Sequence, residues 1–122
     1  MRTFRRERLS SLIQEKLAWM IEREIEVPNT LVTITEVNIT DKLESAEVKV
    51  SAFPSEKKVE AMKVLIKMTP SIQFKLSRIL NIRPMPVIHF KYDEGPNRAA
   101  AVERGLDKES EQLESSPLNK EE

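Results

Sequence analysis

The segment LVTITEVNITDKLESAEVKVSAF, residues 31–53, decides the fold of this chain. Its first part, residues 31–39, is dominated by β-branched side chains, which favour extended backbone. Its last part, residues 46–52, alternates strictly between apolar and polar residues. A period of two is typical of a strand with one buried face. Residues 40–42 (Thr-Asp-Lys) lie between the two parts and favour a turn, so the segment predicts a β-hairpin.

Helical spacing is found on both sides of this hairpin. Between Leu9 and Ile25 the apolar residues recur at intervals of three and four, which predicts an amphipathic helix. After Pro54 the same spacing predicts a second helix, but the pattern breaks around residues 68–71. Thr69 can cap a new helix there, and Pro70 suits the first helical turn. We therefore expect a helix, a break and a third helix rather than one long helix.

The rest of the chain completes one domain. Residues 87–92 alternate again and predict a last strand, so the order is α-β-β-α-α-β. This order favours an α+β fold in which helices lie on one side of a three-stranded sheet. Beyond residue 93 the apolar periodicity is lost. We therefore expect a single domain over residues 1–93 and an acidic tail over residues 94–122 that lacks fixed structure.

The composition argues against catalysis. The chain has no cysteine, which excludes disulfides and thiolate metal sites. Its single histidine, His89, is expected to be exposed and inert, and its two glycines lie at positions 95 and 105, where no phosphate-cradling loop is predicted. We expect no catalytic residue, no metal and no cofactor, and so no enzyme. The absence of an apolar run or leader favours a cytoplasmic protein without membrane contact.

Charge is distributed unevenly along the chain. Residues 1–92 contain 16 Lys+Arg against 11 Asp+Glu, whereas residues 93–122 contain 4 against 9. Residues 1–92 therefore carry a net charge of +5 and residues 93–122 one of −5, although the whole chain is neutral. A basic body with an acidic appendage indicates contact with nucleic acid. Ordinary solvation of a charged surface remains the alternative.

Two basic clusters carry the functional hypothesis. Residues 61–92 hold six basic residues and no acid, and Lys67, Lys75, Arg78 and Arg83 among them are expected to bind a phosphate backbone. The second cluster is Arg2, Arg5, Arg6 and Arg8. Arginines at a helix start oppose the helix dipole, so contact with RNA phosphates accounts for them better than helix stability does. A solvated lysine face and a flexible basic arm are the two alternatives.

In the order and spacing of these pieces, the chain resembles the ribosome-binding factor A family over about residues 4–93. The resemblance rests on the hairpin residues Val32–Thr35, Val37, Asp41, Ala46, Val48, Val50 and Ser51, and on Ile82, Arg83, Pro86, Phe90 and Asp93 around the last strand. It implies a KH-like fold of type II. In that family an Ala-x-Gly kink joins the two helices, and here Met68, Thr69, Pro70 and Ser71 occupy the kink while Gln73 stands where an arginine usually follows.

The resemblance further implies that the protein binds precursor ribosomal RNA of the small subunit during late maturation. Its partner would be the free small subunit, approached as a monomer and without a cofactor. Two alternatives remain open at this stage. One is a protein-interaction adaptor whose binding tolerates salt, and the other is a general KH-like RNA chaperone that binds unrelated structured RNAs equally well.

Overall fold

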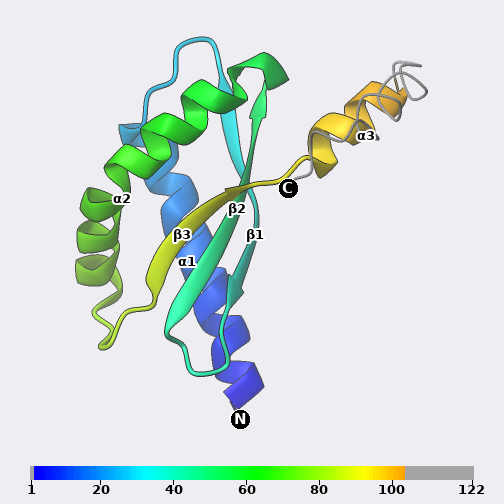
Figure 1. The fold of residues 1–122 in the computed structure, drawn as a ribbon. Helices are drawn as coiled ribbons and strands as arrows, with labels where there is room; N and C mark the ends of the chain where they lie inside the picture. The colour runs from blue at the N-terminus through cyan, green and yellow to red at the C-terminus, as the bar shows by residue number, and fades with distance from the viewer. Residues whose placement is uncertain (1, 104–122) are drawn as a thin grey trace.

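The computed structural model describes residues 2–103. In chain order the elements are α1 (Arg2–Glu24), β1 (Leu31–Ile39), β2 (Ser45–Phe53), the short 3-10 helix η1 (Ser55–Lys57), α2 (Lys58–Leu80), β3 (Val87–Tyr92) and α3 (Gly95–Glu103) (Figure 1). The predicted α+β class, the hairpin and the last strand are confirmed. Two details differ from the sequence expectation, one in α2 and one after β3.

The sheet has the order β1-β2-β3, so β2 is its central strand. β1 and β2 are antiparallel and joined by the predicted turn, whereas β3 runs parallel to β2 because α2 carries the chain back between them. The β1–β2 register shifts between Ile34 and Glu36, which leaves Thr35 in a β-bulge. Ile34 and Val37 are three positions apart, and the extra residue lets both point to the buried face.

The core lies between one face of the sheet and the two long helices, α1 and α2 (Figure 1). The side chains that are almost completely enclosed come from every layer: Ile13, Leu17, Met20, Val48, Val50, Leu65, Leu76 and Ile88. The opposite face of the sheet carries ion pairs, Glu36 with Lys49 at 3.6 Å and Glu47 with Lys91 at 3.9 Å, together with exposed apolar side chains such as Phe53. Such half-exposed pairs contribute little to stability, so burial on the helical side holds the fold together.

The predicted break between two helices is wrong, because α2 is one helix of 23 residues. Met68, Thr69, Pro70 and Ser71 are all helical. Thr69 does not cap a new helix: its hydroxyl donates a hydrogen bond of 2.8 Å to the Leu65 carbonyl, one turn back. Pro70 has no N–H to donate, and the axis of α2 changes direction between its two halves (Figure 1). The proline therefore bends the helix, while the core contacts of Leu65 and Leu76 on either side hold both halves in place.

The expectation for the segment after residue 93 also needs correction. Residues 95–103 form α3, where we expected no fixed structure. Residues 104–122 of the predicted tail lie outside the described residues. Over the part of the chain described, no helix is both long and apolar enough to cross a membrane.

Candidate nucleic-acid interface

Three segments that are distant in sequence meet at one end of the molecule. They are the start of α1, the turn between β1 and β2, and the loop between α2 and β3 (Figure 1). Together they form a groove of about 380 Å³, which we call the basic groove. It is lined by Arg5, Arg8, Leu9, Leu12, Lys42, Leu43, Ile82, Arg83 and Pro84.

Four of these lining residues are cations: Arg5, Arg8, Lys42 and Arg83. None of the residues described in the lining is Asp or Glu. Arg5 and Arg8 are three positions apart and therefore lie on the same side of α1. Four positive charges around one concave surface reinforce each other's field, which attracts a polyanion. Arginine adds paired N–H donors that match the oxygens of a phosphate group.

The turn between β1 and β2 is held by hydrogen bonds centred on Thr40. Its hydroxyl accepts the N–H groups of Glu44 and Ser45 at 3.0 and 3.2 Å, and its carbonyl accepts the Leu43 N–H at 2.9 Å. An ion pair between Arg6 and Asp41 ties the turn to α1. These contacts fix the position of Lys42 at the rim of the basic groove.

Leu43 has an unusual backbone conformation, with φ at 60°. The left-handed region is unfavourable for a side chain with a Cβ atom and costs a leucine about 1–2 kcal/mol. In return, the Leu43 side chain packs against the edge of the core and lines the basic groove. The turn therefore presents an apolar side chain to the groove at a cost in backbone energy.

The third wall of the groove is positioned by Gln73. Its side-chain amide donates to the Pro86 carbonyl at 2.9 Å and its side-chain oxygen accepts the Ile88 N–H at 2.8 Å. Asn81, with φ at 53°, ends α2 through its N–H bond to the Ser77 carbonyl. The loop that carries Arg83 is thereby held at both of its ends. In the sequence, Gln73 could be recognised only as a departure from the family pattern.

The structure brings some of the predicted RNA-binding residues together and separates others. Arg5, Arg8 and Arg83, taken from the two sequence clusters, share the basic groove. Arg6 instead faces Asp41, and Arg2 lies at the first position of α1. Lys67, Lys75 and Arg78 lie on the exposed side of α2, where Lys75 pairs with Glu24 at 2.7 Å and Arg78 lies over the Phe74 ring at 5.7 Å.

Sequence reasoning named three of the nine lining residues, Arg5, Arg8 and Arg83, and missed Lys42 and the five apolar ones. The sequence places Lys42 in a turn next to Asp41. Nothing in the sequence shows which of these two side chains faces the groove. The structure resolves this because Asp41 pairs with Arg6, while Lys42 lines the groove.

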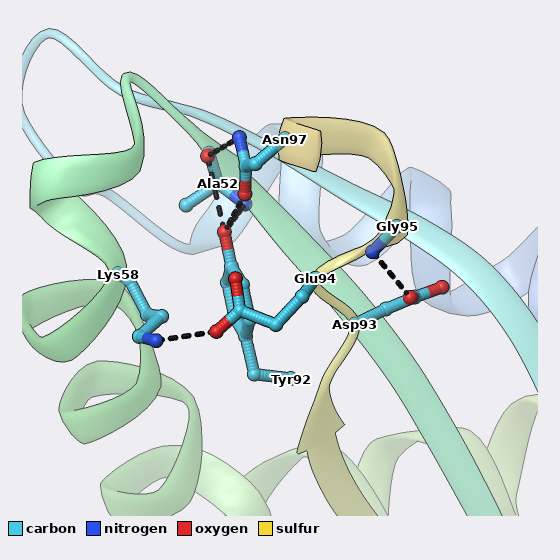
Figure 2. A network of polar contacts seen from close by, with 7 residues as sticks. All are labelled: Ala52, Lys58, Tyr92, Asp93, Glu94, Gly95 and Asn97. Carbon is cyan, nitrogen blue, oxygen red and sulfur yellow. Dashed lines mark hydrogen bonds and ion pairs between the residues drawn. The ribbon is translucent and has the colours of Figure 1, made fainter. Parts of the chain in front are cut away.

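A second polar cluster lies at the opposite end of the sheet and is structural (Figure 2). The Tyr92 hydroxyl accepts the Ala52 N–H at 3.0 Å and donates to the Asn97 side chain, whose amide donates to the Ala52 carbonyl at 3.2 Å. Lys58 pairs with Glu94 at 2.5 Å and lies over the Tyr92 ring at 5.1 Å. These contacts hold the start of α3 against the end of β2.

Asp93 is held by hydrogen bonds that favour its charged form. Its carboxylate accepts the Thr35 hydroxyl at 2.6 Å and the Gly95 N–H at 2.9 Å, and these bonds lower the pKa of Asp93 below its usual value. The carboxylate therefore stays ionised and links the bulge in β1 to the start of α3. His89 is exposed as expected, and the described residues contain no group of three or more His, Cys, Asp or Glu side chains that could hold a metal ion.

Comparison with known proteins agrees with the fold. Residues 5–106 match the family model described as ribosome-binding factor A. A ribosome-binding factor A from Acetivibrio thermocellus is 32% identical over 113 residues, which cover 90% of this chain and 92% of the relative. The solution structure of a Thermotoga maritima protein superposes with a TM-score of 0.62 at 26% identity, over 75% of this chain and 90% of that one.

A further neighbour carries information about a partner of its own. It is a homology model of the Thermus thermophilus ribosome-binding factor A, fitted into a cryo-electron-microscopy map of its complex with the 30S subunit. It matches with a TM-score of 0.59 at 23% identity, over 70% of this chain and 91% of that one. The family model covers most of the described residues, and the fold agrees with the structures of the family. This chain therefore belongs to the ribosome-binding factor A family.

Proposed function

We propose that this protein binds precursor ribosomal RNA of the small subunit during late maturation and leaves when the subunit is finished. It would act in the cytoplasm as a monomer, without catalysis and without a cofactor. The observation that carries this proposal is the basic groove, in which Arg5, Arg8, Lys42 and Arg83 converge with no acid among the described lining residues.

The family and its relatives support the small subunit as the partner. The matching family is described by ribosome binding, and that description names no reaction. The Thermus thermophilus relative has been placed in a map of a 30S complex. RNA of the small subunit is the most abundant polyanion that such a partner offers, and a cationic groove fits its backbone through charge and shape.

A second contact area is expected on α2. Lys67, Lys75 and Arg78 are all exposed on this helix, and Lys63 adds a fourth cation. We propose that these residues touch RNA backbone next to the segment held in the groove. If four to six phosphates are neutralised in total, the logarithm of the affinity should fall with the logarithm of the salt concentration, with a slope of about −3 to −5.

Sedimentation of the tagged protein with purified free small subunits, from low to moderate salt, tests the proposal. We expect the wild type to pellet with free small subunits, to be absent from complete ribosomes and to dissociate as salt rises. The double variant Lys42→Ala/Arg83→Ala should bind more weakly and with a slope that is less negative by about 1.4, because two phosphate contacts are lost. Lys91→Ala removes an exposed cation from the open face of the sheet and is the matched control.

Three results would separate this function from the alternatives. Binding that persists at every salt concentration, with the double variant unimpaired, would favour an adaptor that recognises protein. Equal affinity for unrelated structured RNAs would favour a general RNA chaperone. Protein that does not sediment with small subunits under any condition would overturn ribosomal binding altogether.

A further inference from the structure

The basic groove is apolar at its base, although phosphate binding requires no apolar surface. Five of its nine lining residues are Leu9, Leu12, Leu43, Ile82 and Pro84. Leu9 is buried, but Leu12 is 37% exposed and Pro84 is also open to solvent, while Leu43 and Ile82 are half-buried. The groove therefore offers its ligand five apolar side chains, which we call its floor, together with four cations.

This combination distinguishes two forms of RNA. In an A-form duplex the bases are stacked and paired, and the deep major groove keeps side chains away from them. A duplex could therefore use the four cations of the groove but not its floor. An unstacked nucleotide could use both, because its base has two apolar faces and its phosphates carry the charge.

We infer that the basic groove holds a single unstacked nucleotide of a single-stranded RNA segment. Its base lies against Leu12, Leu43 and Ile82, and the phosphates on either side bind Arg5, Arg8, Lys42 and Arg83. The inference rests on the proposed function and deepens it, since it specifies that the RNA is single-stranded at this site. The size agrees, because about 380 Å³ lies at the lower end of the roughly 300–1,000 Å³ typical of small-ligand sites.

The conformation of Leu43 supports an apolar role for the floor. A residue with φ at 60° is accommodated more easily as asparagine or glycine than as leucine. The turn nevertheless carries a leucine, and its hydrogen bonds around Thr40 do not depend on the side chain at position 43. The apolar surface of Leu43 thus matters for packing and for the groove, while its backbone geometry would be kept by Leu43→Asn.

This property makes Leu43→Asn the decisive variant. It removes the apolar surface, keeps all four cations and suits the backbone of the turn. Leu12→Asn is the second variant, because Leu12 is partly exposed on a helix and its replacement leaves the core intact. Leu31→Asn is the matched control: Leu31 is 66% exposed at the start of β1 and does not line the groove.

Fluorescence anisotropy with two labelled RNAs of equal charge provides the test. One probe is an unstructured single-stranded oligoribonucleotide and the other is a fully paired RNA duplex, both titrated at physiological salt. We expect the wild type to bind the single strand at least about fivefold more tightly than the duplex. Leu43→Asn and Leu12→Asn should each weaken single-strand binding about fivefold and leave duplex binding unchanged. Leu31→Asn should change neither.

The outcomes distinguish failure of this inference from failure of the proposed function. If the wild type binds both RNAs equally and both floor variants behave like the wild type, the groove is a phosphate site only and the inference is overturned. Arg83→Ala should still weaken both complexes in that case, which would keep the proposed function. If the wild type binds neither RNA nor free small subunits, the proposed function fails as well. Thermal unfolding of each variant verifies that the protein remains folded.

Discussion

The two ends of the sheet are built from similar residues but use them differently. At the end where β2 and β3 begin, four cations line the basic groove, and no carboxylate is found among the described lining residues. At the end where the same strands finish, Lys58 is paired with Glu94, and the Asp93 carboxylate accepts the Gly95 N–H (Figure 2). The same carboxylate also accepts the Thr35 hydroxyl. Polar groups at this second end bind one another and hold α3 in place.

The difference teaches how to separate function from structure in a small basic domain. A carboxylate next to a cation offsets part of the positive field that the cation presents to a phosphate. Cations gathered around a concave surface whose described lining residues include no acid add to one another's field, which attracts an external anion. The number of basic residues therefore says less about RNA binding than the location of the acids does.

A matched pair of charge reversals should show the largest effect. Arg83→Glu lies in the basic groove and Lys58→Glu lies at the opposite end, and both change the net charge by the same amount. We expect Arg83→Glu to weaken binding to free small subunits about fiftyfold, or roughly 2.3 kcal/mol, and Lys58→Glu to weaken it less than about threefold. Binding titrations at one salt concentration measure both. Equal losses would mean that only the overall charge matters.

Gln73→Leu should destabilise the groove end through its loop. The variant removes the partners of the Pro86 carbonyl and the Ile88 N–H, and unpaired backbone groups of this kind cost about 1–3 kcal/mol. We expect a loss of about 2 kcal/mol in the free energy of unfolding, measured with urea. Ser71→Ala, an exposed change on the same helix, is the control. Wild-type stability for Gln73→Leu would show that the loop is held by packing alone.

Tyr92→Phe tests the opposite end, where no RNA contact is expected. It removes the hydroxyl that joins Ala52 to Asn97 and leaves the ring in place. We expect a loss of about 1 kcal/mol in unfolding free energy and no change in affinity for the small subunit. Combining it with Asn97→Ala should cost less than the sum of the two single changes, because both residues belong to one network. A weaker complex with RNA would place this end in the interface.

Thr35→Val should give the smallest effect and one that depends on pH. The folded protein holds the pKa of Asp93 below its unfolded value of about 3.9, chiefly through the Thr35 hydroxyl. The stabilisation is therefore complete above that unfolded value and is lost as the pH falls through the lower folded value. At pH 7 the variant should be less stable by somewhat less than 1 kcal/mol.

The pH series for this variant needs unfolding free energies from pH 7 to about pH 2. The difference in unfolding free energy between Thr35→Val and the wild type should become smaller as Asp93 becomes protonated. A remainder is expected at low pH, because the Thr35 hydroxyl also lies 3.3 Å from the Lys49 carbonyl. If the difference in unfolding free energy stays constant over the whole pH series, the Thr35 hydroxyl acts through the Lys49 carbonyl and not through Asp93.

Much of the fold could be predicted from local patterns. The hairpin, the amphipathic first helix and the last strand follow from periods of two and 3.6, which are properties of neighbouring residues. The predicted break at Pro70 was wrong. The sequence shows a proline, which destabilises the interior of a helix, but it does not show the burial of Leu65 and Leu76 that offsets this cost in the folded protein. The helix α3 was missed because Tyr92 and Asn97 contact Ala52, which lies 40 and 45 residues earlier in the chain.

The candidate site was predictable only in part for a similar reason. Sequence clustering selected Arg5, Arg8 and Arg83, which do share the basic groove. It selected Arg6 equally, although this residue pairs with Asp41, and it gave no reason to choose Lys42. Charge in a sequence has a sign but no direction, so only tertiary contacts show which cations gather around the groove.

The sequence by itself determined the α+β class, the strand order along the chain, the absence of cysteine chemistry and the basic character of the domain, because each of these depends on composition or on short-range periodicity. Only the tertiary structure decided that three distant segments meet in one groove, that this groove has an apolar floor and that α2 bends without breaking. Those features arise from contacts between residues far apart in the chain, where burial and charge pairing outweigh local preference.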